Sequence, residues 1–427
     1  MSEMSYLEKL LDGVEVEWLP LGEVSALRRG RVMSKGYLTE NFGPYPVYSS
    51  QTANNGKIGS INTFDFDGEY ISWTTDGANA GTVFYRTGKF SITNVCGLIT
   101  LKSKYPLIYK FLFYWLTIEA KKHVYSGMGN PKLMSHQVEN IPVPIPCPDN
   151  PEKSLAIQSE IVRILDKFTA LTAELTAELT AELNMRKKQY NYYRNQLLSF
   201  DEEQEKPIYL EKLLDGVEVE WKTLKDVCDF KNGFAFKSSL FKETGLPIVR
   251  ITNIDGFNVN LDEVKYFSLN DYKEDLSSFE VSMGNILIAM SGATTGKVGI
   301  YKKGIKCYLN QRVGKFIPKE NILNNNYLYH FLLLNTETIY ILAGGGAQPN
   351  LSSNALMSKL LIPIPCPGNP EKSLAIQSEI VRILDKFDTL TNSITEGLPR
   401  EIELRQKQYE YYRDLLFSFP KPETVSK

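Results

Sequence analysis

The chain has 427 residues, of which 43% are hydrophobic and 23% charged. This length predicts two or three domains, and the composition excludes a largely disordered or collagen-like protein. Five cysteines without a C-x-x-C pair suggest neither a disulfide framework nor a zinc site. With no signal peptide or membrane-spanning run in the sequence, we expect a cytoplasmic protein. The net charge of −2 argues at first against a nucleic-acid ligand.

An internal repeat organises the chain. Residues 6–18 recur unchanged at 209–221, and residues 144–168 recur at 363–387 with one difference. A third block, residues 185–200, closely matches residues 404–419. The first block repeats at an offset of 203 residues and the other two at 219, so the chain contains two copies of one plan, the second sixteen residues longer.

The repeated block after residue 144 predicts one long helix in each copy. Pro151 and Pro370 stand just ahead of it, and Ser154 and Ser373 are candidate caps. Apolar residues at alternating steps of four and three indicate a coiled-coil seam. Its members are Ile157, Ile161, Ile164, Phe168, Leu171 and Leu175 in the first copy and Ile376, Ile380, Ile383, Phe387, Leu390 and Ile394 in the second.

We expect each helix to run for about 47 residues, or about 70 Å. The two helices are predicted to pack on each other, with separate surface helices as the alternative. In the first copy the tetrapeptide TAEL occurs three times, from Thr172 to Leu183, and interrupts the seam with steps of four. In the second copy Gly397 and Pro399 predict a kink.

The segments ahead of the helices, 19–140 and 222–360, predict an α/β or mainly β globule each, because they are rich in Gly, Asn and short β-prone runs. Both contain the signature G-A-x-x-G, at 77–81 and 292–296. Both also end in a glycine-rich loop, which spans residues 127–134 in the first copy and residues 345–352 in the second. The two globules are therefore diverged copies.

The charge is distributed unevenly over this plan. Segment 19–140 carries +5 and segment 222–360 carries +4, which leaves −11 for the rest of the chain. Residues 281–319 contain seven basic and no acidic residues, and residues 77–118 contain five and none. Two basic runs in equivalent places favour a shared polyanionic ligand over two solvated faces.

We find no convincing catalytic or metal-binding motif in the sequence. The run 292–297 has one residue too few for a phosphate-binding loop, and Val298 replaces the Ser or Thr that would hold magnesium. The Asn-Pro-Glu runs lack the second Pro and the aromatic residue of a methyltransferase tetrad. His123, His136 and His330 are too scattered for a relay. The tripeptide Glu263-Val264-Lys265 fits a nuclease pattern that arises by chance in most chains of this size.

Two globules that each lead into a long helix reading EKSLAIQSEIVRILDKF, with a TAEL array in the first helix, resemble the specificity subunit of type I restriction-modification enzymes. The resemblance covers essentially the whole chain and is closest to the subfamily with a TAEL spacer. It implies an α+β protein in which two mixed α/β target recognition domains are joined by an antiparallel coiled coil with pseudo-twofold symmetry. The implied regions are an N-terminal repeated segment (1–18), the first recognition domain (19–143), the central repeated region (144–200), a linker with the second repeated segment (201–221), the second recognition domain (222–362), the C-terminal repeated region (363–419) and a tail (420–427).

The resemblance also implies a subunit that binds double-stranded DNA and has no chemistry or cofactor of its own. In that family two methylation subunits use S-adenosylmethionine to methylate adenine, and two restriction subunits use ATP and magnesium to translocate and cleave DNA. The expected target is bipartite, with a gap set by the TAEL copy number. The main alternative is a tandem-repeat scaffold that binds proteins, and a second is a self-contained nuclease or methyltransferase, which the missing motifs disfavour.

Candidate DNA contacts follow from residue chemistry, since cations neutralise phosphates and amides, hydroxyls and arginine read base edges. The base-edge candidates are Gln51, Asn54, Asn55, Thr75 and Asn79 in the first domain and Thr294, Thr295, Asn310, Gln311 and Arg312 in the second. The phosphate candidates are Arg86, Lys89, Lys297, Lys302 and Lys303. The target sequence itself depends on loop geometry, which residue types alone do not give.

Overall fold

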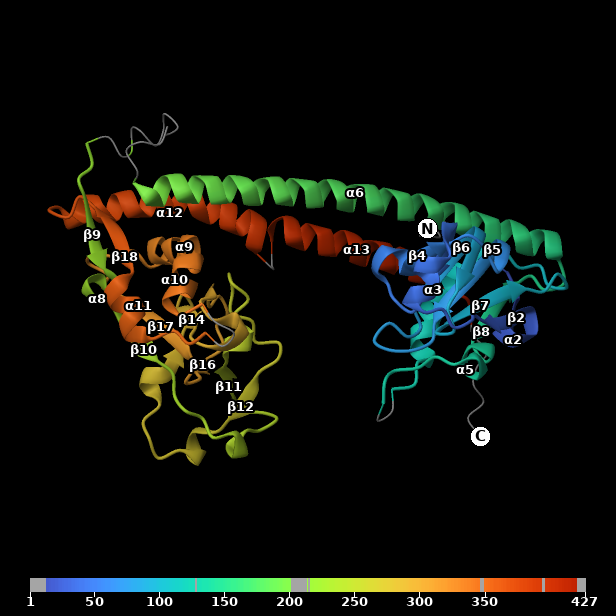
Figure 1. Ribbon diagram of the computed structural model, residues 1–427, viewed down its shortest axis with the longest axis horizontal. Helices are drawn as coiled ribbons and strands as arrows, with labels where there is room; N and C mark the ends of the chain where they lie inside the picture. Colours follow the sequence, from blue (N-terminus) through green and yellow to red (C-terminus); the bar gives the residue numbers. More distant parts are fainter. Residues whose placement is uncertain are drawn as a thin grey trace. The chain divides into compact units, whose positions relative to one another are not determined.

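The computed structural model describes residues 13–126, 129–200, 213, 216–345, 349–393 and 396–420. The chain divides into two compact units (Figure 1). Unit 1 comprises Met1–Ala177 and Glu403–Lys427, and unit 2 comprises Glu178–Ile402. These boundaries differ from the predicted regions, because each unit combines one globule with parts of the helical regions of both copies.

The globule of unit 1 is built on one six-stranded sheet. The sheet has the order β2-β7-β5-β6-β3-β4, and all neighbours are antiparallel except β3 and β6. Its strands are β2 (Ser25–Arg29), β3 (Phe42–Tyr48), β4 (Lys57–Ile61), β5 (Phe66–Thr74), β6 (Val83–Ile92) and β7 (Cys96–Leu101). The helices of this globule are α2 (Leu21–Val24), α3 (Lys35–Glu40), α4 (Tyr109–Glu119) and α5 (Ser135–Glu139), with 3-10 turns η1 (Ala53–Gly56) and η2 (Ala120–His123). The core joins Trp73 of the sheet to Phe111 and Trp115 of α4.

The globule of unit 2 contains two four-stranded sheets, ordered β10-β17-β14-β15 and β12-β11-β16-β13. Their strands are β10 (Cys228–Asn232), β11 (Leu246–Val249), β12 (Lys265–Phe267), β13 (Glu280–Val281), β14 (Ile286–Ala289), β15 (Val298–Ile300), β16 (Cys307–Leu309) and β17 (Val313–Pro318). The helices are α8 (Leu224–Val227), α9 (Asn325–Leu334), α10 (Thr336–Leu342) and α11 (Ser353–Lys359). The 3-10 turns are η3 (Ser238–Leu240), η4 (Ile251–Asn253), η5 (Leu269–Asp271), η6 (Ser277–Phe279) and η7 (Gly292–Thr294).

A short antiparallel strand pair closes each globule where the repeated blocks meet. In unit 1, β1 (Val16–Pro20) pairs with β8 (Pro142–Pro146), and in unit 2, β9 (Val219–Thr223) pairs with β18 (Leu361–Pro365). Trp18 lies opposite Pro144, and its repeat Trp221 lies opposite Pro363. Of the repeated block at 6–18 and 209–221, residues 6–12, 209–212, 214 and 215 fall outside the described residues. The part that is described thus has the same pairing in both copies.

The repeated block forms a helix in each copy, but only the first reaches the predicted length of about 47 residues, since the second ends after 23 residues, and both have different caps from those expected. Helix α6 spans Pro151–Ser199, and α12 spans Pro370–Asn392. Asn150 Oδ1 accepts a hydrogen bond from Lys153 N at 3.0 Å, and Asn369 Oδ1 accepts one from Lys372 N at 3.0 Å. The prediction that Ser154 and Ser373 are caps is wrong, because proline suits the first helical position and the residue before it becomes the cap.

The second copy is broken where a kink was expected. Helix α12 ends at Asn392, and α13 (Gly397–Leu416) begins after a short connection. Gly397 has a φ of +79°, and a Cβ there would lie 2.5 Å from the carbonyl oxygen of Thr389. Ser393, the C-cap residue of α12, accepts a hydrogen bond at its Oγ from Glu396 N at 3.2 Å. The close approach therefore requires glycine, and the break is a built feature of the fold.

The long helices of the two copies pack on each other through equivalent aromatic pairs. In unit 1, Phe168 of α6 stacks on Tyr412 of α13, with ring centroids 5.5 Å apart. In unit 2, Phe387 of α12 stacks on Tyr193 of α6 at 5.3 Å. In unit 2, α12 runs beside α6 (Figure 1). Within unit 1, Thr169 Oγ1 also donates to the Tyr409 hydroxyl at 3.1 Å, so the residue numbers of the contacts increase along α6 and decrease along α13, as in an antiparallel pair. The predicted α+β fold with packed long helices is confirmed.

The seam is broader than the sequence spacing indicated. Ile157, Ile161, Ile376 and Ile380 are buried, while Leu171, also assigned to the seam, exposes 51% of its surface. The remaining described members, Ile164, Phe168, Leu175, Ile383, Phe387 and Leu390, are half-buried, and Ile394 lies outside the described residues.

Two helix residues that the seam omitted are fully buried. Leu165 and Leu384 occupy equivalent positions in the repeat and join the cores of their units. Each helix contacts its globule as well as the partner helix, so its apolar stripe is wider than a two-helix seam.

Candidate nucleic-acid interface

Within each unit, the G-A-x-x-G signature lies beside the glycine-rich loop that ends the globule segment. In unit 1, Gly77 N donates to Pro131 O at 3.0 Å, and Leu133 N donates to Thr75 O at 2.9 Å. In unit 2, the equivalent bonds join Gly292 N to Pro349 O at 3.2 Å and Leu351 N to Met290 O at 2.7 Å. We call these paired segments, residues 77–81 with 127–134 in unit 1 and residues 292–296 with 345–352 in unit 2, the double loop. Residues 127–128 and 346–348 of the double loop lie outside the described residues.

In unit 1 a tight exposed turn lies against the double loop. The turn is η1, which carries the base-edge candidates Asn54 and Asn55, both exposed. Ser50 Oγ donates to Asp76 O at 2.9 Å and ties the turn to the double loop. Gln51, a half-buried candidate, donates from Nε2 to Lys57 O at 2.8 Å. The structure thus brings these three candidates to one surface.

The other two candidates of unit 1 are less accessible. Thr75 is fully buried, and its hydroxyl donates to Val95 O at 2.9 Å. Thr75 is therefore wrong as a base contact in this conformation, because its hydroxyl is buried against Val95 O in the turn between β6 and β7, while its backbone carbonyl holds the double loop. Asn79 is half-buried in the same loop, and its carbonyl accepts a hydrogen bond from Thr74 Oγ1.

In unit 2 the candidates also divide into structural and accessible residues. Thr295 is buried, and its hydroxyl contacts Gly292 O at 2.7 Å and Pro349 O at 3.1 Å, so it too stabilises the double loop and is wrong as a base contact. Thr294 is half-buried, and its hydroxyl has no hydrogen-bond partner in the described structure. Gln311 and Arg312 are exposed, and Asn310 beside them is half-buried. Asn310, Gln311 and Arg312 remain base-edge candidates, whereas the Thr294 hydroxyl oxygen is buried and is not accessible to a base.

Three of the five phosphate candidates have other partners. Arg86 is 2% exposed and cannot reach a phosphate, so that prediction is wrong. Lys302 Nζ lies 3.2 Å from Asp388 of α12, and Lys303 Nζ lies 3.6 Å from Asp262. Lys302 therefore links the globule to the helix, because the buried Asp388 carboxylate needs a cation.

The two remaining cations are exposed and suited to phosphate contact. Lys297 lies three residues after the end of η7, at the double loop of unit 2. Lys89 lies on β6 of unit 1, with its ammonium 4.7 Å from the ring centroid of Phe64. Ammonium groups on the surface attract the DNA backbone without reading its sequence.

Sequence reasoning missed a joint that fixes each globule to its long helix. In unit 1, Asp166 of α6 accepts a hydrogen bond from the Tyr114 hydroxyl at 2.7 Å and pairs with Lys110 at 2.6 Å. In unit 2, Asp385 of α12 contacts His330 Nε2 at 2.7 Å and Asn326 Nδ2 at 3.2 Å. The aspartates lie in the identical repeated block, and that identity was the available signal.

A second contact repeats at each joint. Gln158 accepts a hydrogen bond from Ile108 N at 2.9 Å, and Gln377 accepts one from Asn324 N at 2.8 Å. Both glutamines are fully buried, and each also donates to a backbone carbonyl of its globule. In both contacts, helix residues that are identical in the two copies bond to globule residues that differ. The same joint therefore supports two diverged recognition surfaces.

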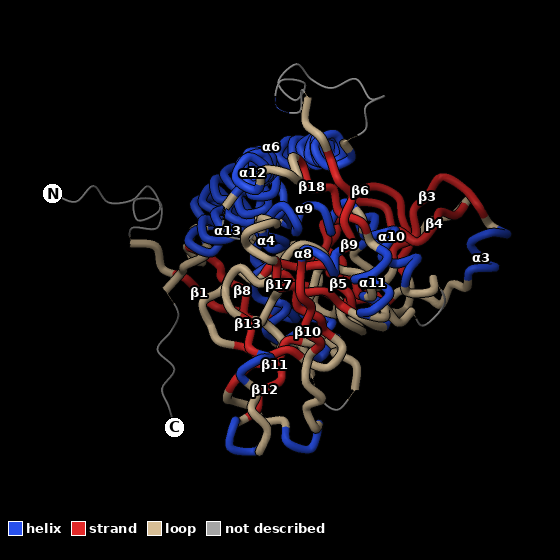
Figure 2. Tube along the Cα trace, turned by 90° about the vertical axis from the view of Figure 1, so that its left-hand side faces the viewer, coloured by secondary structure: helices blue, strands red, loops and turns tan. Residues whose placement is uncertain are grey.

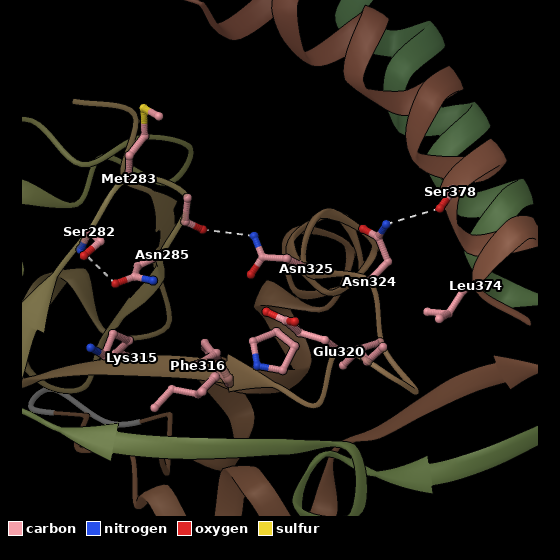
Figure 3. Close-up of a pocket in the computed structure, with 14 residues that line it drawn as sticks. Ser282, Met283, Asn285, Lys315, Phe316, Glu320, Asn324, Asn325, Leu374 and Ser378 are labelled. Atoms are coloured by element: carbon pink, nitrogen blue, oxygen red, sulfur yellow. Dashed lines mark hydrogen bonds between the residues drawn. The ribbon is translucent and has the colours of Figure 1, made fainter. Parts of the chain in front are cut away.

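A cavity of about 740 Å³ lies in unit 2 beside the first turns of α9 and α12 (Figure 3). Asn325 Nδ2 donates to Gly284 O at 2.9 Å, and Asn324 Nδ2 approaches Ser378 Oγ at 3.4 Å across its wall. Lys315 and Glu320 line it together, so it has no excess of positive charge. It is not a candidate for binding the DNA backbone.

Strands β11 and β12 lie at the end of the unit 2 globule remote from α12 (Figures 1 and 2). Within the described ranges, no three His, Cys, Asp or Glu side chains gather as metal ligands would. The same ranges contain no helix that is long and apolar enough to span a bilayer.

Comparison with known proteins identifies the family. The family described as "Type I restriction modification DNA specificity domain" matches residues 13–185 and 216–404. The chain belongs to this family. Each matched range contains one globule; the first ends within α6, and the second contains all of α12 and the start of α13.

Relatives resemble the chain over its full length. The specificity subunit of the Escherichia coli type I restriction enzyme EcoR124I/EcoR124II is 42% identical over 455 aligned residues, covering 100% of both chains. The specificity subunit of the E. coli type I restriction enzyme EcoprrI is 37% identical and covers 93% of both. A solved chain, from work on complex assembly and conformational transition of the type I R-M system, shares the fold with a TM-score of 0.57 and 15% identity, covering 94% of this chain and 97% of its own.

Proposed function

We propose that this chain is the DNA-specificity subunit of a type I restriction-modification complex and binds a bipartite target. The observation that carries the proposal is the double loop, which occurs in both globules with the same backbone bonds and unlike side chains. The same backbone arrangement with different side chains would let the two globules recognise half-sites of different sequence. Family membership and the full-length relatives support the same assignment.

We further propose that the chain contributes recognition and no catalysis. The exposed candidates supply amide, guanidinium and ammonium groups, which bind base edges and phosphates. On this proposal S-adenosylmethionine, ATP and magnesium are bound by partner subunits. Adenine methylation and ATP-dependent restriction of DNA in the cytoplasm are then activities of the assembled complex.

Each unit offers an equivalent exposed apolar pair on its long helix that we assign to a methylation subunit. In unit 2 the pair is Met185 and Tyr192 of α6, which expose 46% and 50% of their surface. In unit 1 it is Leu404 and Tyr411 of α13, at 43% and 64%. Members of a pair are seven residues apart and so lie on one helix face. Two matching faces suit two copies of one partner, and restriction subunits would join the resulting complex.

The experiment is to assemble the chain with the methylation subunits of its own operon and to map methylated adenines in DNA. We expect methylation only at a bipartite sequence with two unlike half-sites and a fixed gap. Methylation by the isolated chain would contradict the non-catalytic role. Stable complexes with proteins but no sequence-specific DNA protection would favour the protein-binding scaffold.

A further inference from the structure

The exposed turn beside the double loop of unit 1 has an unusual backbone. Asn54 has φ and ψ of 50° and 41°, Asn55 has 53° and 32°, and Gly56 has a φ of +78°. Three successive residues are therefore left-handed, a conformation that L-residues disfavour and that Asn tolerates best after Gly. Such a turn persists only where surrounding contacts hold it.

The buried side chain of Arg86 on β6 provides one of the contacts that hold this turn. Its Nη1 donates to Asn55 O at 2.9 Å, and its Nε donates to Ser72 Oγ at 3.0 Å. The guanidinium lies 3.6 Å from the ring centroid of Tyr48 and 4.5 Å from that of Phe84. The side chain is therefore held by two aromatic rings and two hydrogen bonds, one of them to the turn, and helps to fix the position of the turn.

Holding the turn with Arg86 costs folding free energy, because the charge of this side chain is buried. It is 2% exposed, and no carboxylate pairs with it in the part of the chain that the structure describes. Burial lowers its pKa to about 10, so it remains a cation at neutral pH. A neutral donor could satisfy Ser72 and Asn55 without an unpaired buried charge. The cation is instead placed directly beneath an exposed turn, where a polyanion would neutralise it.

The second copy has no such arrangement. Strands β5 and β6 of unit 1 and β14 and β15 of unit 2 pair in the same register, which makes Tyr301 the counterpart of Arg86. Tyr301 is fully buried, and its hydroxyl bonds to Ile305 O. The arginine therefore belongs to the reading surface of one globule and not to the shared frame.

We propose that the turn at Asn54–Gly56 reads bases in the first half-site and that Arg86 is its positioning residue. This inference rests on the proposed function. The exposed amides of Asn54 and Asn55 present the donor and acceptor pair that matches adenine in the major groove. Arg86 fixes the backbone that bears these two amides and does not itself contact DNA.

The test uses the chain assembled with its methylation subunits and duplex oligonucleotides that carry the mapped target or single-base changes in either half-site. Asn54→Gly and Asn55→Gly remove one amide each and keep the left-handed backbone. We expect discrimination at one or two positions of the first half-site to fall roughly tenfold or more, with the second half-site unaffected. Wild-type discrimination in both variants would overturn the proposal.

Arg86→Lys keeps the charge and loses the guanidinium geometry. We expect it to lose discrimination at the same positions as the glycine variants, with an unchanged salt dependence of binding. Lys89→Met, exposed on the same strand, is the matched control and should weaken all sequences equally. Arg86→Lys with wild-type discrimination would refute the positioning role. If wild-type complex showed no sequence preference, the proposed function itself would be at fault.

Discussion

At the residue scale, side chains that look alike in sequence have different tasks in the structure. Thr75 and Thr295 were base-edge candidates, yet both hydroxyls are buried and bonded to backbone carbonyls, those of Val95 and Pro349. Lys302 was a phosphate candidate and instead pairs with Asp388. Residue type and local charge predicted which loops matter, but the partner of each side chain depends on contacts between distant segments. Those contacts were not readable from spacing alone.

The exposed candidates of unit 2 should separate base reading from phosphate binding. Arg312→Ala is expected to relax one base position by about 1–3 kcal/mol, because guanidinium groups make bidentate contacts to guanine. Lys297→Ala should weaken binding to all sequences and lower the salt slope by about one. Binding titrations of the assembled complex at several salt concentrations distinguish the two effects. Indistinguishable behaviour of the two variants would refute this division.

The joints between globule and helix should differ in their contribution to stability. Asp385→Ala leaves the fully buried His330 without its Nε2 partner, which should cost about 1–3 kcal/mol of unfolding free energy. Asp166→Ala is the matched variant and should cost less, since Lys110 is partly exposed and can be solvated. Urea unfolding of the two variants measures the difference. An equal loss in both would argue against the role of burial.

At the element scale, the sequence predicted the long helix of the first copy well, but not the length of its counterpart in the second copy or the caps of either helix. A helix of 49 residues follows from unbroken helix-forming sequence and a repeated apolar spacing. The wider buried stripe through Leu165 and Leu384 was missed, because periodicity shows that a face is apolar but not how many neighbours cover it. The break before Gly397 was expected only as a kink, since the close approach to Thr389 is a tertiary contact.

The TAEL array in α6 should act as a spacer for the two half-sites. Deletion of residues 176–179 removes about 6 Å of helix and close to one full turn, so the flanking faces keep nearly the same direction. We expect the unread gap to change by about one base pair while both half-sites stay the same. Mapping methylated adenines for the variant checks this. Altered half-site bases would contradict the spacer role.

At the scale of the whole molecule, the duplicated plan was evident from sequence, while the division into compact units was not. Repeated blocks gave two globules and two helical regions, but each unit combines one globule with helix segments from both copies. Sequence order cannot show this exchange, because it arises when the helices of the two copies pack on each other. The net charge of −2 was equally uninformative until it was divided along the repeat.

The two exposed apolar pairs predict the number of methylation subunits. Tyr192→Ser with Met185→Ser should leave one partner bound per chain, and so should Tyr411→Ser with Leu404→Ser, because each change removes one exposed apolar face. Combining all four changes should abolish binding. Native mass spectrometry of the complexes counts the partners. Two bound subunits in every variant would place the contact elsewhere.

The double loop also bears on how such a protein can change over generations. Its frame consists of backbone hydrogen bonds, such as those from Gly77 N to Pro131 O and from Gly292 N to Pro349 O. Most side-chain substitutions, other than those at the glycines and the buried threonines, leave these backbone hydrogen bonds intact. Exposed positions on this frame can therefore mutate without loss of folding, and a lineage can acquire new DNA targets while it keeps one architecture.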